Sequence, residues 1–285
     1  MVPAMASRRA VLALVVAVAA SAASVAADDP DYSYVQGTKL GPENWAKLSP
    51  KYSACNGGAA ARKQSPIDIV TKSAVPKPDL DPLTRTYVAT DATLVNNGKE
   101  ISMTFNGKPG SVSIGGKAFS LKKLRWKTPS EHTINGKRHP VEVQLVHESD
   151  AGSGELAIIA ILYKLGAPDS FYYQLKRKLA ELAADRCSYG EQDARVAAGL
   201  VHLRSLEKRT GSYFRYMGSL TAPPCAENVY WNVLGKVRQM TKEQIDLVTA
   251  PLPAAAKQNA RPVQPLNGRV VTFYNPPNST ISFDM

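Results

Sequence analysis

The 285 residues carry 35 Lys and Arg against 24 Asp and Glu, a formal charge of +11, and 44% of them are hydrophobic. This composition excludes a disordered chain or a coiled coil, and three cysteines are too few for a disulfide-framework mini-domain or a four-thiolate zinc site. The positive residues are scattered, so nucleic acid is not an expected partner, whereas acidic cell-wall polymers or small anions fit the excess charge.

The first 27 residues have the pattern of a secretory signal peptide. Arg8 and Arg9 precede an apolar run over residues 10–20, which small residues extend to Ala27, just before Asp28. A membrane anchor is one alternative, although the run is barely long enough to span a bilayer, and a plastid transit peptide is another. We therefore expect a protein that is secreted or in the secretory pathway, with no membrane partner after cleavage.

Short strands are predicted after a turn-rich segment over residues 31–66. Turn signals such as Asn97-Gly98 and Gly115-Gly116 separate these strands and are typical of hairpins. The strands are predicted over residues 87–94, 100–105, 111–114, 119–126 and 141–146. The continuous apolar run over 156–165 indicates a buried central strand.

Helical patterns follow in the second half of the chain. Apolar residues recur at helical spacing over 171–182 after the start signal Pro168-Asp169-Ser170, and Thr241 with Gln244 forms a capping-box pattern. Further strands are predicted over 213–220, 229–237 and 270–274. Since no repeat or long linker divides the chain, we expect one α+β domain over residues 28–285, mostly β and dominated by an antiparallel sheet.

Export implies an oxidising compartment, and this bears on the cysteines and on the C-terminal tail. We expect two of the three cysteines, Cys55, Cys187 and Cys225, to pair. The sequon that begins at Asn278 marks a position that can carry a glycan, and its occupancy stays open.

Six segments together resemble the plant branch of the α-class carbonic anhydrases. They occur in family order and read GPENW (41–45), QSPIDI (64–69), SEHTING (130–136), LVH (145–147), GSLTAPPC (218–225) and NARPVQPLN (259–267). The resemblance implies a large twisted, predominantly antiparallel central sheet with peripheral helices and a conical pocket that holds zinc. It also implies reversible hydration of CO2 as the family reaction.

The residues at the zinc-ligand positions that the resemblance implies are not histidines. The family has His-x-His before the Ser-Glu-His segment and a third histidine before Val-His, where this chain has Arg125, Lys127 and Gln144. A guanidinium has no lone pair to offer, and moving the pKa of a lysine from about 10.4 to 7 costs about 5 kcal/mol. We therefore expect no zinc, no other metal cofactor and no CO2 hydratase activity.

The resemblance assigns roles to other residues around this degenerate site. Glu131 and Thr221 match the pair that orients the zinc-bound hydroxide, and Glu142 matches a carboxylate behind the ligands. Lys99 occupies the position of the proton-shuttle histidine, and an amine that titrates near 10 cannot pass protons efficiently at neutral pH. The apolar wall where CO2 would sit is matched by Val146, Ile158, Leu220, Val229 and Trp231.

The resemblance also implies a disulfide between Cys55 and Cys225, which leaves Cys187 as a buried or surface thiol. The loop that this disulfide closes is long, so the chain-entropy model predicts a contribution of about 4–5 kcal/mol to stability.

Strand alternation predicts that Arg125 and Lys127 lie on the same face, and two cations in place of a divalent metal suggest a compensation hypothesis. We expect Arg125 and Lys127 to form internal ion pairs with Glu131 and Glu142, so that no buried charge is left unpaired. A variant of this hypothesis has the two cations bind a small anion such as bicarbonate.

The overall expectation is a secreted storage or small-anion-binding protein, similar to the non-catalytic dioscorin/nectarin-like branch of the family. The alternative is an enzyme, either a carbonic anhydrase with residual or rescued activity or an ascorbate-linked reductase. The sequence gives no indication of the oligomeric state.

Overall fold

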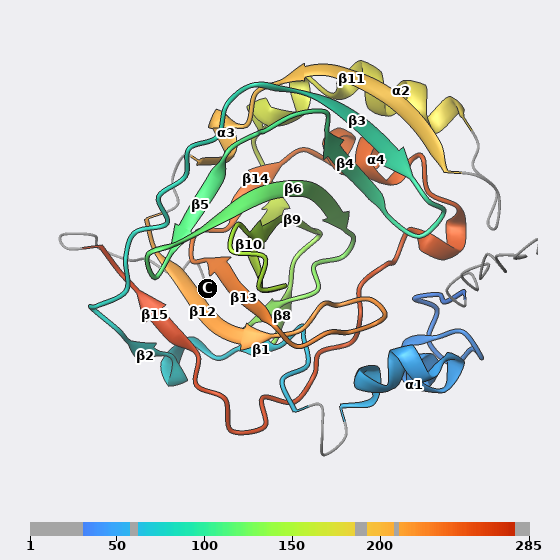
Figure 1. Ribbon diagram of the computed structural model, residues 1–285. Coiled ribbons are helices and arrows are strands. Elements are labelled where there is room, and N and C mark those ends of the chain that lie inside the picture. Colours follow the sequence, from blue (N-terminus) through green and yellow to red (C-terminus); the bar gives the residue numbers. More distant parts are fainter. Residues whose placement is uncertain (1–30, 58–61, 186–192, 208–210, 277–285) are drawn as a thin grey trace, which may run out of the picture. The chain divides into compact units, whose positions relative to one another are not determined.

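One large β-sheet forms the framework of the computed structural model, which describes residues 31–57, 62–185, 193–207 and 211–276 (Figure 1). Within these residues the sheet has twelve strands, most of them in the order β11-β3-β4-β6-β9-β10-β13-β12-β15-β2, with β5 beside β6 and β14 beside β10. The bounds are β2 Val75–Pro76, β3 Thr90–Asn96, β4 Ile101–Phe105, β5 Ser111–Ile114, β6 Lys117–Lys127, β9 Val141–Ser149, β10 Leu156–Leu165, β11 Ala194–Val201, β12 Tyr213–Gly218, β13 Val229–Leu234, β14 Arg238–Met240 and β15 Thr272–Tyr274. The predicted signal peptide, Cys187 and Asn278 lie outside the described residues.

The sheet is mixed, although most neighbouring strands are antiparallel. β10 runs antiparallel to β9 on one side and parallel to β13 on the other, where Ile158 lies opposite Trp231. β14 and β2 also join the sheet through parallel pairs. The expected mostly β fold with a large, predominantly antiparallel sheet is therefore confirmed. The parallel strand pairs were not predicted from the sequence.

A three-stranded sheet lies beside the large one and consists of β1 (Asp68–Ile69), β7 (Thr133–Ile134) and β8 (Lys137–Arg138). The turn between β7 and β8 is Asn135-Gly136, and both of its residues have positive φ, at 50° and 77°. A two-residue hairpin turn needs this conformation, which Asn and Gly adopt at the lowest cost. The sheet thus places the segment around residues 130–136 against β1.

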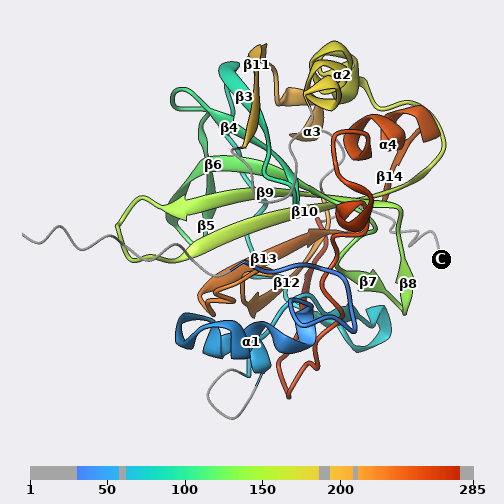
Figure 2. The ribbon, with the colours of Figure 1, turned by 90° about the vertical axis from the view of Figure 1, so that its right-hand side faces the viewer.

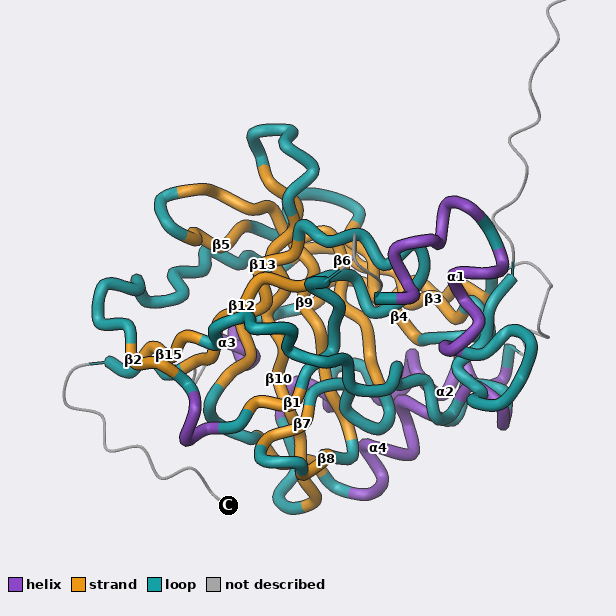
Figure 3. The backbone as a smooth tube through the Cα atoms, turned by 90° about the horizontal axis from the view of Figure 1, so that it is seen from below, coloured by secondary structure: helices purple, strands orange, loops and turns teal. Residues whose placement is uncertain are grey.

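The helices are short and lie outside the central strands. They are α1 Trp45–Leu48, α2 Lys176–Ala184, α3 Arg204–Glu207 and α4 Lys242–Thr249, with 3₁₀ turns η1 Pro42–Asn44, η2 Pro50–Asn56, η3 Thr71–Ser73, η4 Ser170–Tyr173 and η5 Ala254–Ala256. Figure 2 shows α2 and α4 next to each other at the end of the sheet formed by β11, β3 and β4, and Figure 3 shows β6, β9 and β10 side by side with α1, α2 and α4 outside them.

The helix predicted over 171–182 is divided into η4 and α2, with Leu179 and Leu182 buried. The capping box at α4 is confirmed, since the side chain of Thr241 accepts from the backbone N–H of Gln244 and the Gln244 side chain accepts in return. Among the described residues, no helix has the length and apolar character needed to cross a bilayer.

Apolar side chains cover both faces of the central strand β10. Ile159 and Ile161 belong to the larger apolar cluster, whereas Ile158 and Leu162 belong to a second cluster with Trp231. Successive side chains of a strand point to opposite faces, so a strand buried on both faces must be apolar throughout. This confirms the interpretation of residues 156–165 as a buried central strand.

The predicted disulfide between Cys55 and Cys225 is confirmed. The two sulfurs join η2 to the segment that follows β12 across 170 residues of chain. Both cysteines are buried in a small apolar cluster whose other members, among them Tyr34 and Trp45, come from the N-terminal segment. The disulfide therefore fixes the N-terminal segment to the connection between β12 and β13, which carries Thr221.

Candidate functional site

Residues 125, 127 and 144 come together because β6 pairs with β9. In this register Arg125 lies opposite Gln144, and Lys127 lies opposite Glu142. Side chains alternate along a strand, so Arg125 and Lys127 share one face while Trp126 packs into the larger apolar cluster on the other. Lys127 and Gln144 expose 0% of their surface and Arg125 exposes 3%. The expected placement of two cations on one face is confirmed, in a region closed to water.

Arg125 is held by hydrogen bonds to two neighbouring side chains. Its Nε donates to Oε1 of Gln144 over 2.6 Å, and its Nη2 donates to Oγ1 of Thr221 over 3.1 Å. The guanidinium also lies 3.9 Å from the carboxylate of Glu100. Burial opposes its charge, but the carboxylates of Glu100 and Glu131 raise the pKa of Arg125 above its usual value. The side chain is therefore charged and fixed.

Lys127 lies among two carboxylates and a phenol. Its Nζ is 3.0 Å from the carboxylate of Glu100 and 3.9 Å from that of Glu131. It donates to the hydroxyl of Tyr34 over 2.7 Å and lies 4.3 Å from the centre of the same ring. A buried ammonium needs such partners, because an isolated charge in a dry interior is strongly disfavoured.

The compensation hypothesis is correct for Glu131 and wrong for Glu142. Lys127 does pair with Glu131, but Glu142 is bonded to His132, whose Nδ1 lies 3.0 Å away, and to the backbone N–H groups of Glu131 and His132. The carboxylate that faces both cations is Glu100, which the sequence analysis did not include. It precedes β4, where Ser102 lies opposite Arg125, so strand alternation turns Glu100 to the same face.

The two buried carboxylates are ionised for different reasons. Burial alone would raise the pKa of Glu100, but the charges of Lys127 and Arg125 lower this pKa to about 2. Burial would also raise the pKa of Glu142, and contact with His132 lowers it to about 2. The positive charges of the site are thus matched by negative charges inside the protein.

Gln144 and Thr221 connect the charged groups of the site. Nε2 of Gln144 donates to Glu131 over 2.9 Å and to Glu142 over 2.7 Å, which fixes the orientation of its amide. Oγ1 of Thr221 donates to Oε2 of Glu131 over 2.5 Å while it accepts from Arg125. The backbone N–H of Arg261 donates to the other oxygen of Glu131 over 3.0 Å. Each of these polar groups therefore has a protein partner.

This set of side chains does not fit a zinc ion. Zinc takes imidazole nitrogens, thiolates or carboxylate oxygens, whereas Arg125 and the charged Lys127 offer only hydrogen-bond donors. The amide oxygen of Gln144 already accepts from Arg125. In the described part of the chain, no group of three or more His, Cys, Asp and Glu side chains is arranged to hold a metal.

The five residues expected to form an apolar wall are brought together on the same face of the sheet. Val146 lies two residues beyond Gln144 on β9 and opposite Ile158 on β10. Four of the five are buried in the second apolar cluster and Leu220 packs against it half-buried; the five are Val146, Ile158, Leu220, Val229 and Trp231. The wall and the charged centre are therefore neighbours on one face.

Lys99, at the position of the family's proton shuttle, lies near the N-terminal segment. Its ammonium is 2.6 Å from the carboxylate of Asp31 and 4.9 Å from the centre of the Tyr32 ring. The side chain is half-buried, so this ion pair ties the start of the described chain to the turn before β4. Sequence reasoning also missed Tyr34, because the turn-rich pattern around it gave no indication that its hydroxyl reaches the centre of the sheet.

A family model described as eukaryotic-type carbonic anhydrase matches residues 40–275. Among curated proteins, "Alpha carbonic anhydrase 7" of Arabidopsis thaliana is 36% identical over 258 residues, with 90% of each chain covered. "Dioscorin DB3L" of Dioscorea polystachya is 37% identical over 248 residues, with 87% of each chain covered.

Two solved structures are similar as well. A structure of dioscorin complexed with ascorbate has a TM-score of 0.80 at 36% identity and covers 87% of this chain and 100% of its own. The α-carbonic anhydrase of Thermovibrio ammonificans, solved with the inhibitor sulfanilamide, has a TM-score of 0.73 at 34% identity and covers 85% and 99%.

Proposed function

The chain belongs to the eukaryotic-type (α-class) carbonic anhydrase family, and on this premise we propose that it is a zinc-free member without CO2 hydratase activity. We further propose that it acts as a secreted storage protein that binds small organic anions. The observation that carries the first proposal is the position of Arg125, whose guanidinium donates to both Gln144 and Thr221. These are two of the residues that the family resemblance places around the metal and its hydroxide.

Zinc binding at this centre is opposed by two physical costs. The guanidinium of Arg125 and the ammonium of Lys127 offer no lone pair to a metal, and a lysine becomes a ligand only after it has lost a proton. A divalent ion placed there would also be repelled by both cations. We therefore propose that Arg125, Lys127, Glu100 and Glu131 form a charge cluster that stabilises the fold in place of a metal.

Loss of zinc would remove the family reaction because the nucleophile is a hydroxide. Zinc lowers the pKa of its bound water from about 15.7 to about 7, so an unassisted water supplies about eight orders of magnitude less hydroxide at neutral pH. The hydroxyl of Thr221, which the resemblance implies would orient the hydroxide, accepts from Arg125 instead. Both the activation and the orientation of the nucleophile are thus missing from the proposed site.

The storage role rests on the resemblance to the dioscorin-type proteins. "Dioscorin DB3L" is 37% identical to this chain, and a dioscorin has been solved with ascorbate. Ascorbate carries a negative charge at neutral pH, and this chain has a formal charge of +11, so ascorbate and bicarbonate are suitable anions for a first binding test.

A stopped-flow assay of CO2 hydration tests the absence of activity. The purified protein is incubated with equimolar zinc, and a carbonic anhydrase with three histidine ligands is measured beside it. We expect a hydration rate equal to the uncatalysed rate, with no change on adding sulfanilamide. Hydration that sulfanilamide inhibits would contradict the proposal and favour the alternative, a carbonic anhydrase with rescued activity.

Secretion is proposed from the signal pattern of residues 1–27 and is supported by the disulfide between Cys55 and Cys225, since such bonds persist in oxidising compartments. N-terminal sequencing of the mature protein is expected to begin at Asp28. A mature protein that begins at Met1 would contradict this proposal.

A further inference from the structure

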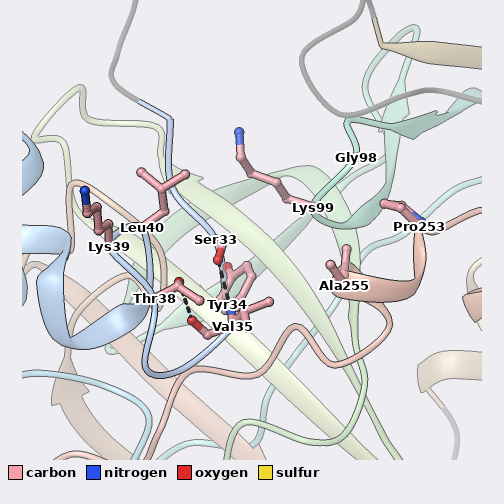
Figure 4. A pocket seen from close by; sticks show the side chains of 11 residues that line it. Ser33, Tyr34, Val35, Thr38, Lys39, Leu40, Gly98, Lys99, Pro253 and Ala255 are labelled. Carbon is pink, nitrogen blue, oxygen red and sulfur yellow. Dashed lines mark hydrogen bonds between the residues drawn. The ribbon is translucent and has the colours of Figure 1, made fainter.

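Two neighbouring pockets lie between the N-terminal segment 33–40 and the segment 253–262. The first has a volume of about 560 Å³, and its lining is almost entirely apolar; it includes Tyr34, Val35, Leu40, Pro253, Ala255 and Ala256 (Figure 4). The second has a volume of about 740 Å³ and a mixed lining that includes Arg138, Lys257 and Arg261. Both volumes suit a small molecule, and Tyr34, Val35 and Ala255 line both pockets.

The charged side chains that line the two pockets are all basic, and one of them, Lys99, is paired with Asp31 outside the lining. The first pocket is lined by Lys39 and Lys99 and the second by Arg138, Lys257 and Arg261, while neither lining includes an Asp or a Glu. Arg138 and Lys257 are exposed, and Arg261 is buried. Low-dielectric walls that carry charges of one sign concentrate ions of the other sign, so an anion is the expected occupant.

The wall formed by residues 33–40 is held in place before any ligand arrives. The hydroxyl of Ser33 accepts from the backbone N–H of Val35, and the hydroxyl of Thr38 donates to the backbone carbonyl of Val35, as Figure 4 shows. The indole N–H of Trp45 donates to the carbonyls of Ser33 and Leu40. A preformed wall lowers the ordering cost of binding.

The opposite wall, formed by residues 253–262, is also held by hydrogen bonds to other parts of the chain. Asn259 exchanges hydrogen bonds with the backbone of Thr128 and donates to the carbonyl of Lys99. Arg261 donates to Gln64, Ser65 and Cys55, but its Nε has no hydrogen-bond partner among the described residues. A buried donor without a partner is costly. The guanidinium of Arg261, beside the second pocket, therefore has hydrogen-bonding capacity that the described protein groups do not use.

An anion is not expected at Arg125 and Lys127, which the sequence analysis had named as a possible anion site. The charges of these residues are compensated by Glu100 and Glu131 at 3.0–3.9 Å. Tyr34 accepts from Lys127 and lines both pockets, so its ring stands between the buried centre and the pockets. By contrast, the ammonium of Lys257 and part of the Arg138 guanidinium remain available to a ligand.

We propose that the two pockets form one binding site for a small aromatic carboxylate or sulfonate. The ring occupies the apolar pocket against Tyr34, Leu40 and Pro253, and the anionic group lies in the second pocket near Arg138 and Lys257. Arg138 already donates to the carbonyls of Ser130 and Glu131, which fixes the side chain and leaves its other N–H groups for the anion. This site deepens the anion-binding part of the proposed function.

Isothermal titration calorimetry of the full chain with three probes tests the site. Naphthalene-1-sulfonate combines a ring with an anion, naphthalene-1-methanol has the ring alone, and sulfate has the anion alone. We expect the sulfonate to bind at one site per chain and at least about tenfold more tightly than either of the others, because only the sulfonate uses both pockets. Equal affinity for all three probes, or no heat at millimolar concentration, would overturn the proposal.

Four variants locate the bound probe. Lys257→Gln and Arg138→Gln are each expected to weaken sulfonate binding about fivefold, and Ala255→Trp, at an exposed position, is expected to abolish it by filling the apolar pocket. Lys108→Gln changes an exposed lysine that lines neither pocket and should leave the affinity unchanged. Thermal denaturation checks that each variant is folded.

The same titrations separate this proposal from the proposed function. Unchanged binding in Lys257→Gln, Arg138→Gln and Ala255→Trp would place the probe elsewhere and overturn the site, without any bearing on zinc content or CO2 hydration. Conversely, zinc-dependent CO2 hydration would contradict the proposed function. It would not affect the proposed binding site if the three variants still bind the sulfonate more weakly than the native protein.

Discussion

The ammonium of Lys127 lies 3.0 Å from the carboxylate of Glu100, and both side chains are buried, Lys127 completely and Glu100 with 9% of its side chain exposed. Arg125 lies 3.9 Å from the same carboxylate, so one acidic side chain faces two cations. A buried cation without a counter-charge would cost several kcal/mol, on the order of the stability of a whole domain. Glu100 is therefore what allows an arginine and a lysine to occupy the centre of the sheet.

Replacing Glu100 by Gln is expected to destabilise the protein strongly. The substitution keeps the shape of the side chain but removes the charge that compensates Lys127 and Arg125. Breaking one side of a buried pair costs about 3–5 kcal/mol, because the remaining charges stay buried without a partner. Urea denaturation at pH 7 measures the change in unfolding free energy.

Glu148→Gln is the matched control for this substitution. Glu148 is an exposed residue of β9 whose carboxylate lies 3.5 Å from Lys122, so its loss should change the unfolding free energy by less than about 0.5 kcal/mol. A Glu100→Gln variant as stable as this control would show that the pair makes no net contribution.

Stability is expected to fall in two stages as the pH is lowered from 7. Burial lowers the pKa of His147 from 6.5 to about 4. Between pH 6.5 and 4 the unfolded chain therefore binds a proton at this residue that the folded protein does not bind, which lowers the stability of the fold. The carboxyls of Glu100 and Glu142 have an ordinary pKa of 4.5 and a folded pKa of about 2, so their stabilising charges are lost between pH 4.5 and 2. Each group contributes a slope of about 1.4 kcal/mol per pH unit within its window.

Urea midpoints measured from pH 7 to pH 2.5 test this profile. The Glu100→Gln variant should show the same dependence of stability on pH as the native protein between pH 6.5 and 4.5. Below pH 4.5 its stability should fall less steeply, by about 1.4 kcal/mol per pH unit, because one titrating carboxyl has been removed. Identical slopes for the variant and the native protein below pH 4.5 would mean that folding does not lower the pKa of Glu100.

The residues at the site show how far sequence reasoning reaches. The alternation of β6 was sufficient to place Arg125 and Lys127 on one face, and the apolar run of β10 identified a strand buried on both faces. Glu100 was missed because its contact with Lys127 depends on the register between β4 and β6, which no local pattern encodes.

The fold itself was predicted unevenly for similar reasons. β11 (Ala194–Val201) was not predicted, since this strand pairs only with β3 in the large sheet, and its partly exposed Ala- and Gly-containing sequence lacks clear alternation. The parallel pairing of β10 with β13 was also missed, because strands of either direction share the same side-chain period of two.

Removal of the disulfide is expected to lower the unfolding free energy substantially. Cys55 and Cys225 are separated by 170 residues, and closing a loop of this length contributes about 4–5 kcal/mol in the chain-entropy model. The variant Cys55→Ala/Cys225→Ala is compared with the native protein by urea denaturation, with and without dithiothreitol. Dithiothreitol should destabilise the native protein but not the variant. A variant whose unfolding free energy is less than about 1 kcal/mol below that of the native protein would contradict the expectation.

Restoring three histidines tests the charge argument from the opposite direction. In the triple variant Arg125→His/Lys127→His/Gln144→His, Glu100 loses both cationic partners, so the zinc-free variant should be less stable than the native protein. Zinc supplies two positive charges and three ligand bonds, and at about 1,000 times its dissociation constant it would contribute about 4 kcal/mol. We expect added zinc to raise the melting temperature of this variant by about 10 °C.

The matched control is the double variant Arg125→His/Lys127→His, which keeps Gln144 in place of the third ligand. It should respond to zinc more weakly than the triple variant, and the native protein should not respond at all. Equal zinc shifts in all three proteins would show binding at another position.

Zinc content tests the central claim most directly. The full chain is purified, incubated with a twofold excess of zinc at pH 7.5, passed over a desalting column and measured by inductively coupled plasma mass spectrometry, with the triple-histidine variant treated in parallel. The account predicts less than about 0.1 zinc per chain for the native protein and about one for the variant, because Arg125 and Lys127 offer no lone pairs. One zinc per native chain, lost on mutation of Gln144 or Lys127, would contradict it.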